Sequence, residues 1–283
     1  MEQTITDIKS LRNSQSPSVA RDSSRDCEHD IFAEAGERTL SIDPGSVAWF
    51  LGSIAFMLAL ASVSIQFIDY LTGYHSIIIH KLVKLFDLDL EVNVPTFFSV
   101  GILLIASLLL FVITLFEHSA KRRIFEWALL AGGFLFMAFD EMASIHERLI
   151  EPMRDLLGIS HLGMFYYAWV VPAMVLVGVL GIVFLKFVIR LHRSVSKWFL
   201  LAGAMYLFGA VGLEMFEGVV GTGNFIYTAL VTAEESFEMA GAIVFIWTLL
   251  SYIRDNSSGI QIRLPERVKG RIENVEPLQE FVF

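Results

Sequence analysis

The sequence contains a single cysteine, Cys27, which excludes a disulfide framework and any zinc or iron–sulfur centre built from several thiolates. Charged residues are also scarce: they make up 18% of the chain, whereas 55% of the residues are hydrophobic. This proportion is too apolar for a soluble domain and indicates a membrane protein. Basic residues are not in excess, because the net charge is −9. We therefore expect no nucleic-acid partner, since such a partner requires a basic surface.

Six stretches are long and apolar enough to cross a membrane, because about 20 apolar residues in a helix span roughly 30 Å of hydrocarbon. They cover residues 47–68, 96–116, 124–144, 164–189, 198–217 and 232–253. In most of them the apolar residues surround the whole helix, which excludes a surface amphipathic helix. The sequence therefore predicts an all-α integral membrane bundle of about six transmembrane helices over residues 47–253.

The two ends of the chain are polar. Residues 1–46 are rich in Ser, Asp, Glu and Arg, so we expect a disordered tail, and residues 254–283 form a second polar tail. Basic residues gather in two of the connections and near the C-terminal tail: Lys121, Arg122, Arg123, Arg190, Arg193, Lys197 and Arg254. Short loops rich in Lys and Arg stay in the cytoplasm, which predicts cytoplasmic termini. Lys81, Lys84, Arg148 and Arg154 lie in the opposite loops and oppose this orientation.

Acidic residues interrupt three of the predicted spans. The third span ends in Asp140, Glu141, His146 and Glu147, the fifth ends in Glu214 and Glu217, and the sixth begins with Glu234, Glu235 and Glu238. The predicted orientation places all three segments at the same depth, near the outer face. Residues three or four apart share one face of a helix, so each helix can offer carboxylates to a common centre.

Acids within a span require compensation. A carboxylate there costs about 2.5–3.5 kcal/mol on insertion scales, and several together repel, so they are protonated, paired with cations or bound to metal. Oxygen-rich ligation with one imidazole suits a divalent ion of Fe, Mn, Mg or Ca. The predicted ligands are Asp140, Glu141, His146, Glu147, Glu214, Glu217, Glu235 and Glu238. His146 and Glu147 are the predicted catalytic acid or base.

Several details of this site remain open. The Glu-x-x-His motif of two-metal bundles is absent, because Ala143 precedes His146 by three residues. Further imidazoles could complete the ligand shell from loops, namely His75, His80 and His161, and Gln66 and Asp69 could join it from the first span. An amphipathic helix within residues 75–90 could cover the site on the membrane surface.

Structural interpretations compete with the metal hypothesis. Thr232-x-x-Glu235 matches a capping box, which would explain Glu234 and Glu235 as first-turn residues of a helix. Glu147 and Glu151 could lie in water beyond the third span. Small residues of the spans are expected to let helices approach closely, namely Gly132, Gly133, Gly178, Gly181, Gly209 and Gly212.

The segment Asp140-Glu141-x4-His146-Glu147, followed by Glu214-x-x-Glu217 and Glu234-Glu235-x-x-Glu238-Met239, resembles a pattern of uncharacterised bacterial multi-pass membrane proteins. The resemblance covers the third, fifth and sixth predicted spans. It implies a location in the bacterial inner membrane and implies no particular reaction.

Three functions are compatible with these patterns. The first is a metal-dependent enzyme acting on a membrane lipid or another apolar substrate. The second is an ion- or proton-coupled transporter that uses the same acids, and the third is a structural or sensory protein with a cation site. The inner halves of the predicted spans, such as Trp127-Ala-Leu-Leu-Ala-Gly-Gly-Phe134, have almost no ionisable groups, which favours chemistry at one face over transport.

Overall fold

The computed structural model describes residues 43–72, 76–119 and 124–256. All regular secondary structure in these ranges is helical, and the elements in chain order are α2 (Pro44–Leu71), α3 (Ile77–Phe86), α4 (Val94–Ser119), α5 (Phe125–Ala143), α6 (Ile145–Leu157), α7 (Val170–Arg190), α8 (Arg193–Leu207), the π-helical turn η1 (Phe208–Leu213), α9 (Glu214–Val220) and α10 (Phe225–Asn256). Helices α2, α4, α7, the continuous series α8–η1–α9, and α10 are long and apolar enough to cross a membrane. Helices α5 and α6, bent by 80° relative to each other, pass the same test only as a pair, so the described residues hold five such helices, or six if this pair is one span. The predicted all-α membrane bundle is confirmed.

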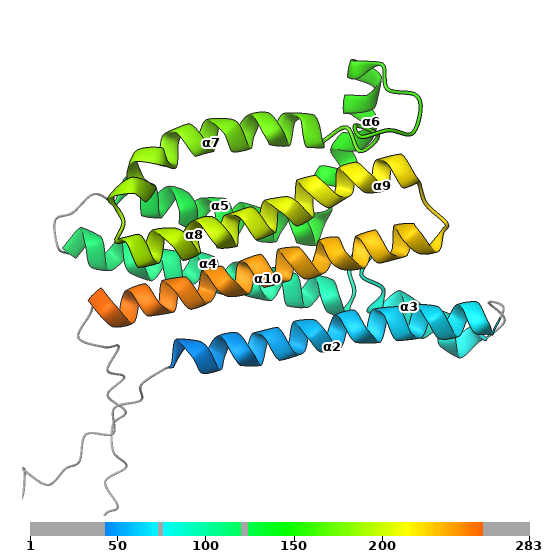
Figure 1. Ribbon diagram of the computed structural model, residues 1–283, viewed down its shortest axis with the longest axis horizontal. Coiled ribbons are helices and arrows are strands. Elements are labelled where there is room, and N and C mark those ends of the chain that lie inside the picture. The colour runs from blue at the N-terminus through cyan, green and yellow to red at the C-terminus, as the bar shows by residue number, and fades with distance from the viewer. Residues whose placement is uncertain (1–42, 73–75, 120–123, 257–283) are drawn as a thin grey trace, which may run out of the picture. The chain divides into compact units, whose positions relative to one another are not determined.

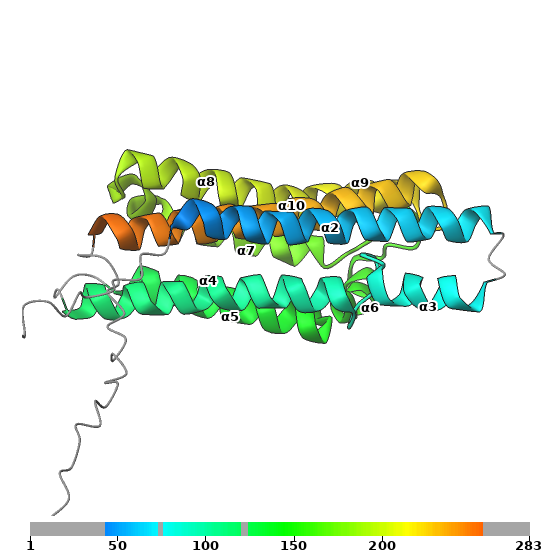
Figure 2. The ribbon, with the colours of Figure 1, turned by 90° about the horizontal axis from the view of Figure 1, so that it is seen from below.

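The spanning helices run side by side along one axis (Figure 1). Seen from below, α4 and α5 form one layer, and α2, α8 and α10 lie in a second layer above it (Figure 2). Helix α10 packs against α2, α4 and α8, and its fully buried Ile246 and Leu249 form the core with Leu110 of α4. Helix α7 is the exception, because Val170 and Phe187 are its only buried residues.

Successive connections alternate between the two ends of the bundle. Helix α2 begins and α10 ends at one end, where α4 is followed by α5 and α7 by α8 (Figure 1). Helices α3 and α6 and the turn between α9 and α10 lie at the other end. This alternation brings the carboxyl ends of α5 and α9 to the same end of the bundle as the start of α10.

Three of the predicted boundaries need correction. Helix α2 begins at Pro44, inside the predicted disordered tail, because Asp43 accepts a hydrogen bond from the Ser46 N–H at 2.7 Å and caps the first turn. The fourth span was predicted to begin at residue 164, but residues 158–169 form no regular helix. The sixth helix begins at Phe225, ahead of the predicted residue 232. The rest of both predicted tails, residues 1–42 and 257–283, lies outside the described residues.

Helix α3 lies within the expected amphipathic segment and is followed by a loop, residues 87–93, that returns to the bundle. Two contacts with α2 hold this loop. Gln66 Nε2 donates to Asp87 Oδ1 at 2.7 Å, and Ser62 Oγ accepts from the Leu88 N–H at 3.2 Å. Val92 adopts a left-handed conformation with φ of 59°, which is unusual for a β-branched residue. The loop is thus fixed in a specific conformation beside the acidic end of α5.

Candidate functional site

An acidic cavity of about 380 Å³ lies between the loop 87–93, α5, α6, α7, η1, α9 and α10. Ten carboxyl groups line it: Asp89, Glu91, Asp140, Glu141, Glu147, Glu214, Glu217, Glu234, Glu235 and Glu238. His146 lines it as well, and no Lys or Arg of the described chain does. A cavity of this composition has a strongly negative potential unless protons or cations fill it.

The structure brings all eight residues predicted as ligands to this one cavity. Asp140 and Glu141 come from the end of α5, His146 and Glu147 from the first turn of α6, and the other four from α9 and α10. Helical spacing explains why the acids of α10 line the same cavity. Glu238 lies three residues after Glu235 and four after Glu234, so the three acids share one face of the helix.

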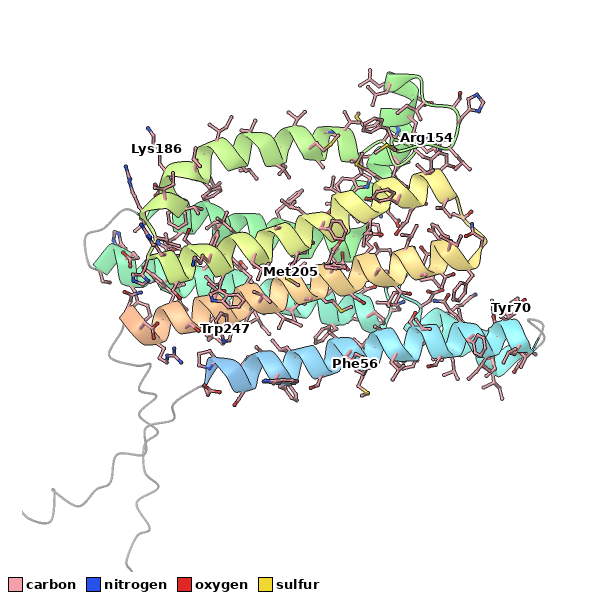
Figure 3. All side chains as sticks on the ribbon, in the orientation of Figure 1. Phe56, Tyr70, Arg154, Lys186, Met205 and Trp247 are labelled. Carbon is pink, nitrogen blue, oxygen red and sulfur yellow. The ribbon has the colours of Figure 1, made fainter. Side chains whose placement is uncertain are left out.

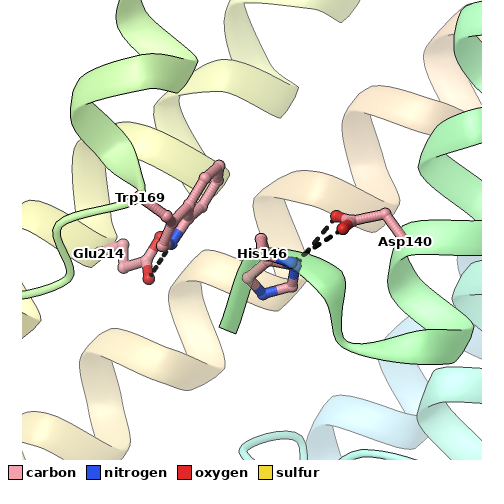
Figure 4. Close-up of polar contacts among 4 residues, drawn as sticks. All are labelled: Asp140, His146, Trp169 and Glu214. Carbon is pink, nitrogen blue, oxygen red and sulfur yellow. Dashed lines mark hydrogen bonds and ion pairs between the residues drawn. The ribbon is translucent and has the colours of Figure 1, made fainter. Parts of the chain in front are cut away.

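A bend of 80° between α5 and α6 pairs Asp140 with His146. Ser144 adopts a left-handed conformation with φ of 48°, which ends α5 and turns the chain into α6. Asp140 Oδ1 accepts the backbone N–H of His146 at 3.0 Å, and Asp140 Oδ2 lies 2.9 Å from His146 Nδ1 (Figure 4). Both oxygens of Asp140 are therefore engaged with His146. The sequence predicted Asp140 as a direct ligand, whereas its geometry is that of a carboxylate that orients an imidazole.

One small group of side chains has the spacing of a cation site. Ligand atoms of Glu91, His146 and Glu147 all lie within 4.8 Å of one another. Glu91 comes from the loop 87–93 and was missed by sequence reasoning. The signal for it is the acidic run Asp87-Leu-Asp89-Leu-Glu91 in the connection on the predicted outer side. Glu91 Oε2 is buried and makes no hydrogen bond within the described residues.

Trp169 connects the imidazole to the acids of α9. Its indole N–H donates to Glu214 Oε1 at 2.6 Å, and its ring centroid lies 5.0 Å from that of His146 (Figure 4). Trp169 precedes α7 in the irregular segment 158–169 and forms part of the wall of the cavity.

The acids of α9 and α10 face each other at close range. Glu217 is 3% exposed, and its carboxyl group contacts that of Glu234. Glu217 Oε1 makes no hydrogen bond in the part of the chain that the structure describes. Deeper in the bundle, the hydroxyl of Tyr206 on α8 lies close to the carboxyl group of Glu238, and both residues line the cavity. Two carboxyl groups in contact require a shared proton or a cation between them.

The capping interpretation of Glu234 and Glu235 is wrong. Thr232 lies inside α10, where its hydroxyl donates to the carbonyl oxygen of Thr228 at 2.8 Å. Neither glutamate is in the first turn of the helix, so the helix terminus does not explain them. Their side chains line the cavity instead.

Of the side chains that could have completed the shell, those that the structure describes do not line the cavity. His80 and His161 do not line it, and neither do Gln66 and Asp69. His75 lies outside the described residues.

The Lys and Arg residues of the described chain do not form ion pairs with the acids of the cavity. Arg154 of α6 pairs with the exposed Glu151 at 2.9 Å and lies over the ring of Tyr166 (Figure 3). Lys186 is near the far end of α7 (Figure 3). The acids of the cavity therefore have no Lys or Arg partner among the ion pairs of the described residues.

The acids of the loop 87–93 bind protons more tightly than free carboxylates. Burial, followed by the charges of Glu141 and Glu147, raises the pKa of Glu91 from 4.5 to about 7. Burial also raises the pKa of Asp89, against a hydrogen bond that the Tyr227 hydroxyl donates to Asp89 Oδ1 at 2.8 Å. At neutral pH a bound cation would therefore compete with protons for these groups.

A family model described as a domain of unknown function (DUF8692) matches residues 47–253. The chain belongs to this family. The matched region contains every residue that lines the acidic cavity. No curated protein and no solved structure matches the chain.

Proposed function

We propose that this protein is a membrane enzyme that binds one or more divalent cations (Fe, Mn, Mg or Ca) in the acidic cavity and acts on a lipid or another apolar substrate. The observation that carries the proposal is a single cavity lined by ten carboxyl groups and one imidazole, without Lys or Arg from the described chain. Oxygen ligands of this kind suit hard divalent cations. A cation bound there supplies Lewis acidity or activates a water molecule.

Glu91, His146 and Glu147 are the best-placed ligands for a first cation, because their ligand atoms are mutually within 4.8 Å. Asp140 holds Nδ1 of His146, which leaves Nε2 available to a cation, as in other carboxylate–histidine–metal arrangements. Glu217 and Glu234 form a second carboxylate pair in the same cavity, able to hold a further cation. A residue of the cavity that does not bind the cation could serve as the general base.

The acidic residues of the cavity lie toward one end of the bundle, which favours an enzyme over a transporter. Its lining extends no further along α10 than Glu238 and no further along α5 than Gly133. Beyond these positions the buried side chains are mainly apolar, including Ile113, Trp127 and Ile246. A transporter needs polar access from both sides of the membrane. The mainly apolar packing of the described residues beyond these positions does not favour such access.

We also propose that the protein lies in a bacterial inner membrane with both termini in the cytoplasm and the acidic cavity toward the outer face. The end opposite the cavity carries Arg190, Arg193, Lys197 and Arg254, as expected for a cytoplasmic face. In a Cys27→Ser background, cysteines placed at the exposed Arg193 and Asn224 should react with impermeant reagents from opposite sides. Reaction of Asn224→Cys only after membrane rupture would invert this orientation.

The cation proposal is tested by thermal unfolding of the detergent-solubilised protein. A ligand that binds only the folded state stabilises it by about 2.7 kcal/mol at a concentration 100 times its Kd. A chelator should therefore lower the melting temperature, and Mn²⁺, Fe²⁺, Mg²⁺ or Ca²⁺ should restore it. Metal analysis of the purified protein should find the same ion, and Glu238→Ala should weaken both responses. If chelation has no effect while acidification stabilises the protein, the acids hold protons and the transporter hypothesis takes precedence.

A further inference from the structure

The acidic cavity continues into an apolar part, here called the apolar arm, whose walls are provided by α5, α7 and the end of α8 with η1. On α7 the lining residues are Ala173, Leu176, Val177 and Leu180, which lie three, four and seven residues apart and so share one face of the helix. Phe136 of α5 and Val211 of η1 lie on the other walls. The cavity thus has a polar end and an apolar end.

The apolar arm reaches the lipid-facing surface between α5 and α7. Phe136 and Leu176 both line the cavity, yet they are 57% and 55% exposed. No residue of α7 between Val170 and Phe187 is buried, so the middle of this helix is not packed against the bundle. Helix α7 is long and apolar enough to cross a membrane, and α5 is so together with α6, so the surface at this opening faces hydrocarbon and not water.

We infer that the apolar arm binds the hydrocarbon chain of a membrane amphiphile that enters sideways between α5 and α7 and carries its uncharged or cationic head group to the acidic end. The inference rests on the proposed function and names its substrate class. A hydrocarbon chain is the occupant because the arm is lined by apolar side chains and opens to lipid. A head group without negative charge follows from ten carboxyl groups that no Lys or Arg of the described chain accompanies.

Photolabelling of the full-length protein in lipid nanodiscs tests this inference. The probe is a long-chain primary alcohol with a diazirine in its chain, and the comparison probe is the fatty acid with the same chain and diazirine. The alcohol should label the peptides that contain Phe136 and Leu176 in a saturable manner, with competition by the unlabelled alcohol. The fatty acid should label these peptides several-fold less.

Two matched variants of α7 separate the apolar arm from the lipid-facing side of the same helix. Val177→Trp places a large ring in the arm and should reduce the saturable labelling several-fold. Ile182→Trp is the control, because Ile182 is 77% exposed and does not line the cavity. It should leave the labelling unchanged. If Val177→Trp impairs folding, Ala173→Leu fills the same arm with a smaller change, and competition in the unmodified protein remains a test.

Labelling that does not saturate, or that is equal in the two tryptophan variants, would show only contact with bulk lipid and would overturn the inference. Equal labelling by the fatty acid would overturn the assignment of the head group. The cation response of the melting temperature is measured on the same samples. Saturable labelling without a cation response would reject the metal proposal and retain the apolar arm as a binding site. A cation response without saturable labelling would retain the metal proposal and reject the apolar arm as a binding site.

Discussion

At the scale of single residues, Glu217 and Asp140 have distinct environments in the acidic cavity. Glu217 is buried, contacts Glu234 and has an oxygen without a hydrogen bond in the described structure. Asp140 has both oxygens engaged by His146. The first geometry is that of a ligand and the second that of a residue that positions a ligand, so their substitutions should have different effects.

Replacing Glu217 with Gln should weaken the stabilisation by cations at least tenfold in apparent affinity, because the amide supplies no negative charge. Without a cation the variant should be as stable as the native protein or more stable, since the contact with Glu234 no longer joins two acids. Thermal unfolding against Mn²⁺ concentration measures both effects. Glu117→Gln is the matched control, because Glu117 is equally interior but lies outside the cavity, where Tyr252 donates to it at 2.8 Å. An equal loss of apparent cation affinity in Glu217→Gln and Glu117→Gln would contradict a ligand role for Glu217.

Replacing Asp140 with Asn should reduce cation affinity about 10- to 100-fold, the usual effect of losing a carboxylate that orients a metal-bound imidazole. The number of cations bound at saturation should stay the same, because His146 itself remains. Isothermal titration with Mn²⁺ measures affinity and number together. Loss of a whole binding equivalent would identify Asp140 as a direct ligand, as the sequence predicted.

At the scale of helices, the approach of η1 to α10 determines how closely the acids meet. A Cβ atom at Gly209 would lie 2.7 Å from the carbonyl oxygen of Glu234 and 3.0 Å from Cγ of Glu238. The π-helical turn η1 immediately precedes Glu214, and such turns are frequent at functional sites. Gly209 therefore allows the two acid-bearing helices to come into contact.

Gly209→Ala should destabilise the protein by about 1–3 kcal/mol, as expected for overpacking against backbone, and should weaken the cation response because α10 must move away. Gly178→Ala of α7 is the control. A Cβ atom there meets no neighbouring atom within 4 Å, so this variant should be neutral or gain up to about 1 kcal/mol from helix propensity. Thermal unfolding with and without Mn²⁺ provides the comparison. Equal stability of the two variants would show that the close approach at Gly209 is not required.

At the scale of the whole molecule, the loop acids make stability depend on pH. The pKa of Glu91 is raised to about 7 in the folded protein, from an ordinary value of 4.5. Between these two values the folded state binds more protons than the unfolded state, so stability falls as pH rises from about 4.5 to about 7. Below this window Glu91 is protonated in both the folded and the unfolded state and contributes nothing to the pH dependence of stability.

Melting temperatures measured in a chelator should therefore decrease across this window, and Glu91→Gln should flatten the decrease. With Mn²⁺ present the trend should weaken or reverse, because a cation favours the ionised carboxylates. Glu151→Gln is the control for surface charge, since Glu151 is exposed and pairs with Arg154. A pH profile that is the same with chelator and with Mn²⁺ would argue against a cation in the cavity.

The sequence by itself determined the membrane bundle and the acids that its helices carry, because both depend on local properties. An apolar run of sufficient length must become a helix in hydrocarbon, and successive spans must alternate in direction. The positions of Asp140, Glu214 and Glu238 along their spans then place them at one end of the bundle. The glycines at which helices approach closely were less predictable. A Cβ atom at Gly132, Gly133, Gly178 or Gly181 would meet no neighbouring atom within 4 Å, whereas one at Gly218 or Gly241 would meet neighbouring backbone.

Only the tertiary structure decided which groups complete the cavity. Glu91 reaches it because α2 holds the loop 87–93 through Gln66 and Ser62, a contact between distant segments. Asp140 pairs with His146 because the chain bends by 80° at Ser144, which no periodicity indicates. Thr232 matched a helix start, but α10 begins at Phe225, where Asn224 Oδ1 accepts a hydrogen bond from the Tyr227 N–H at 2.9 Å. Loop conformations and helix ends depend on contacts between distant parts of the chain, and the local pattern of residues does not specify those contacts.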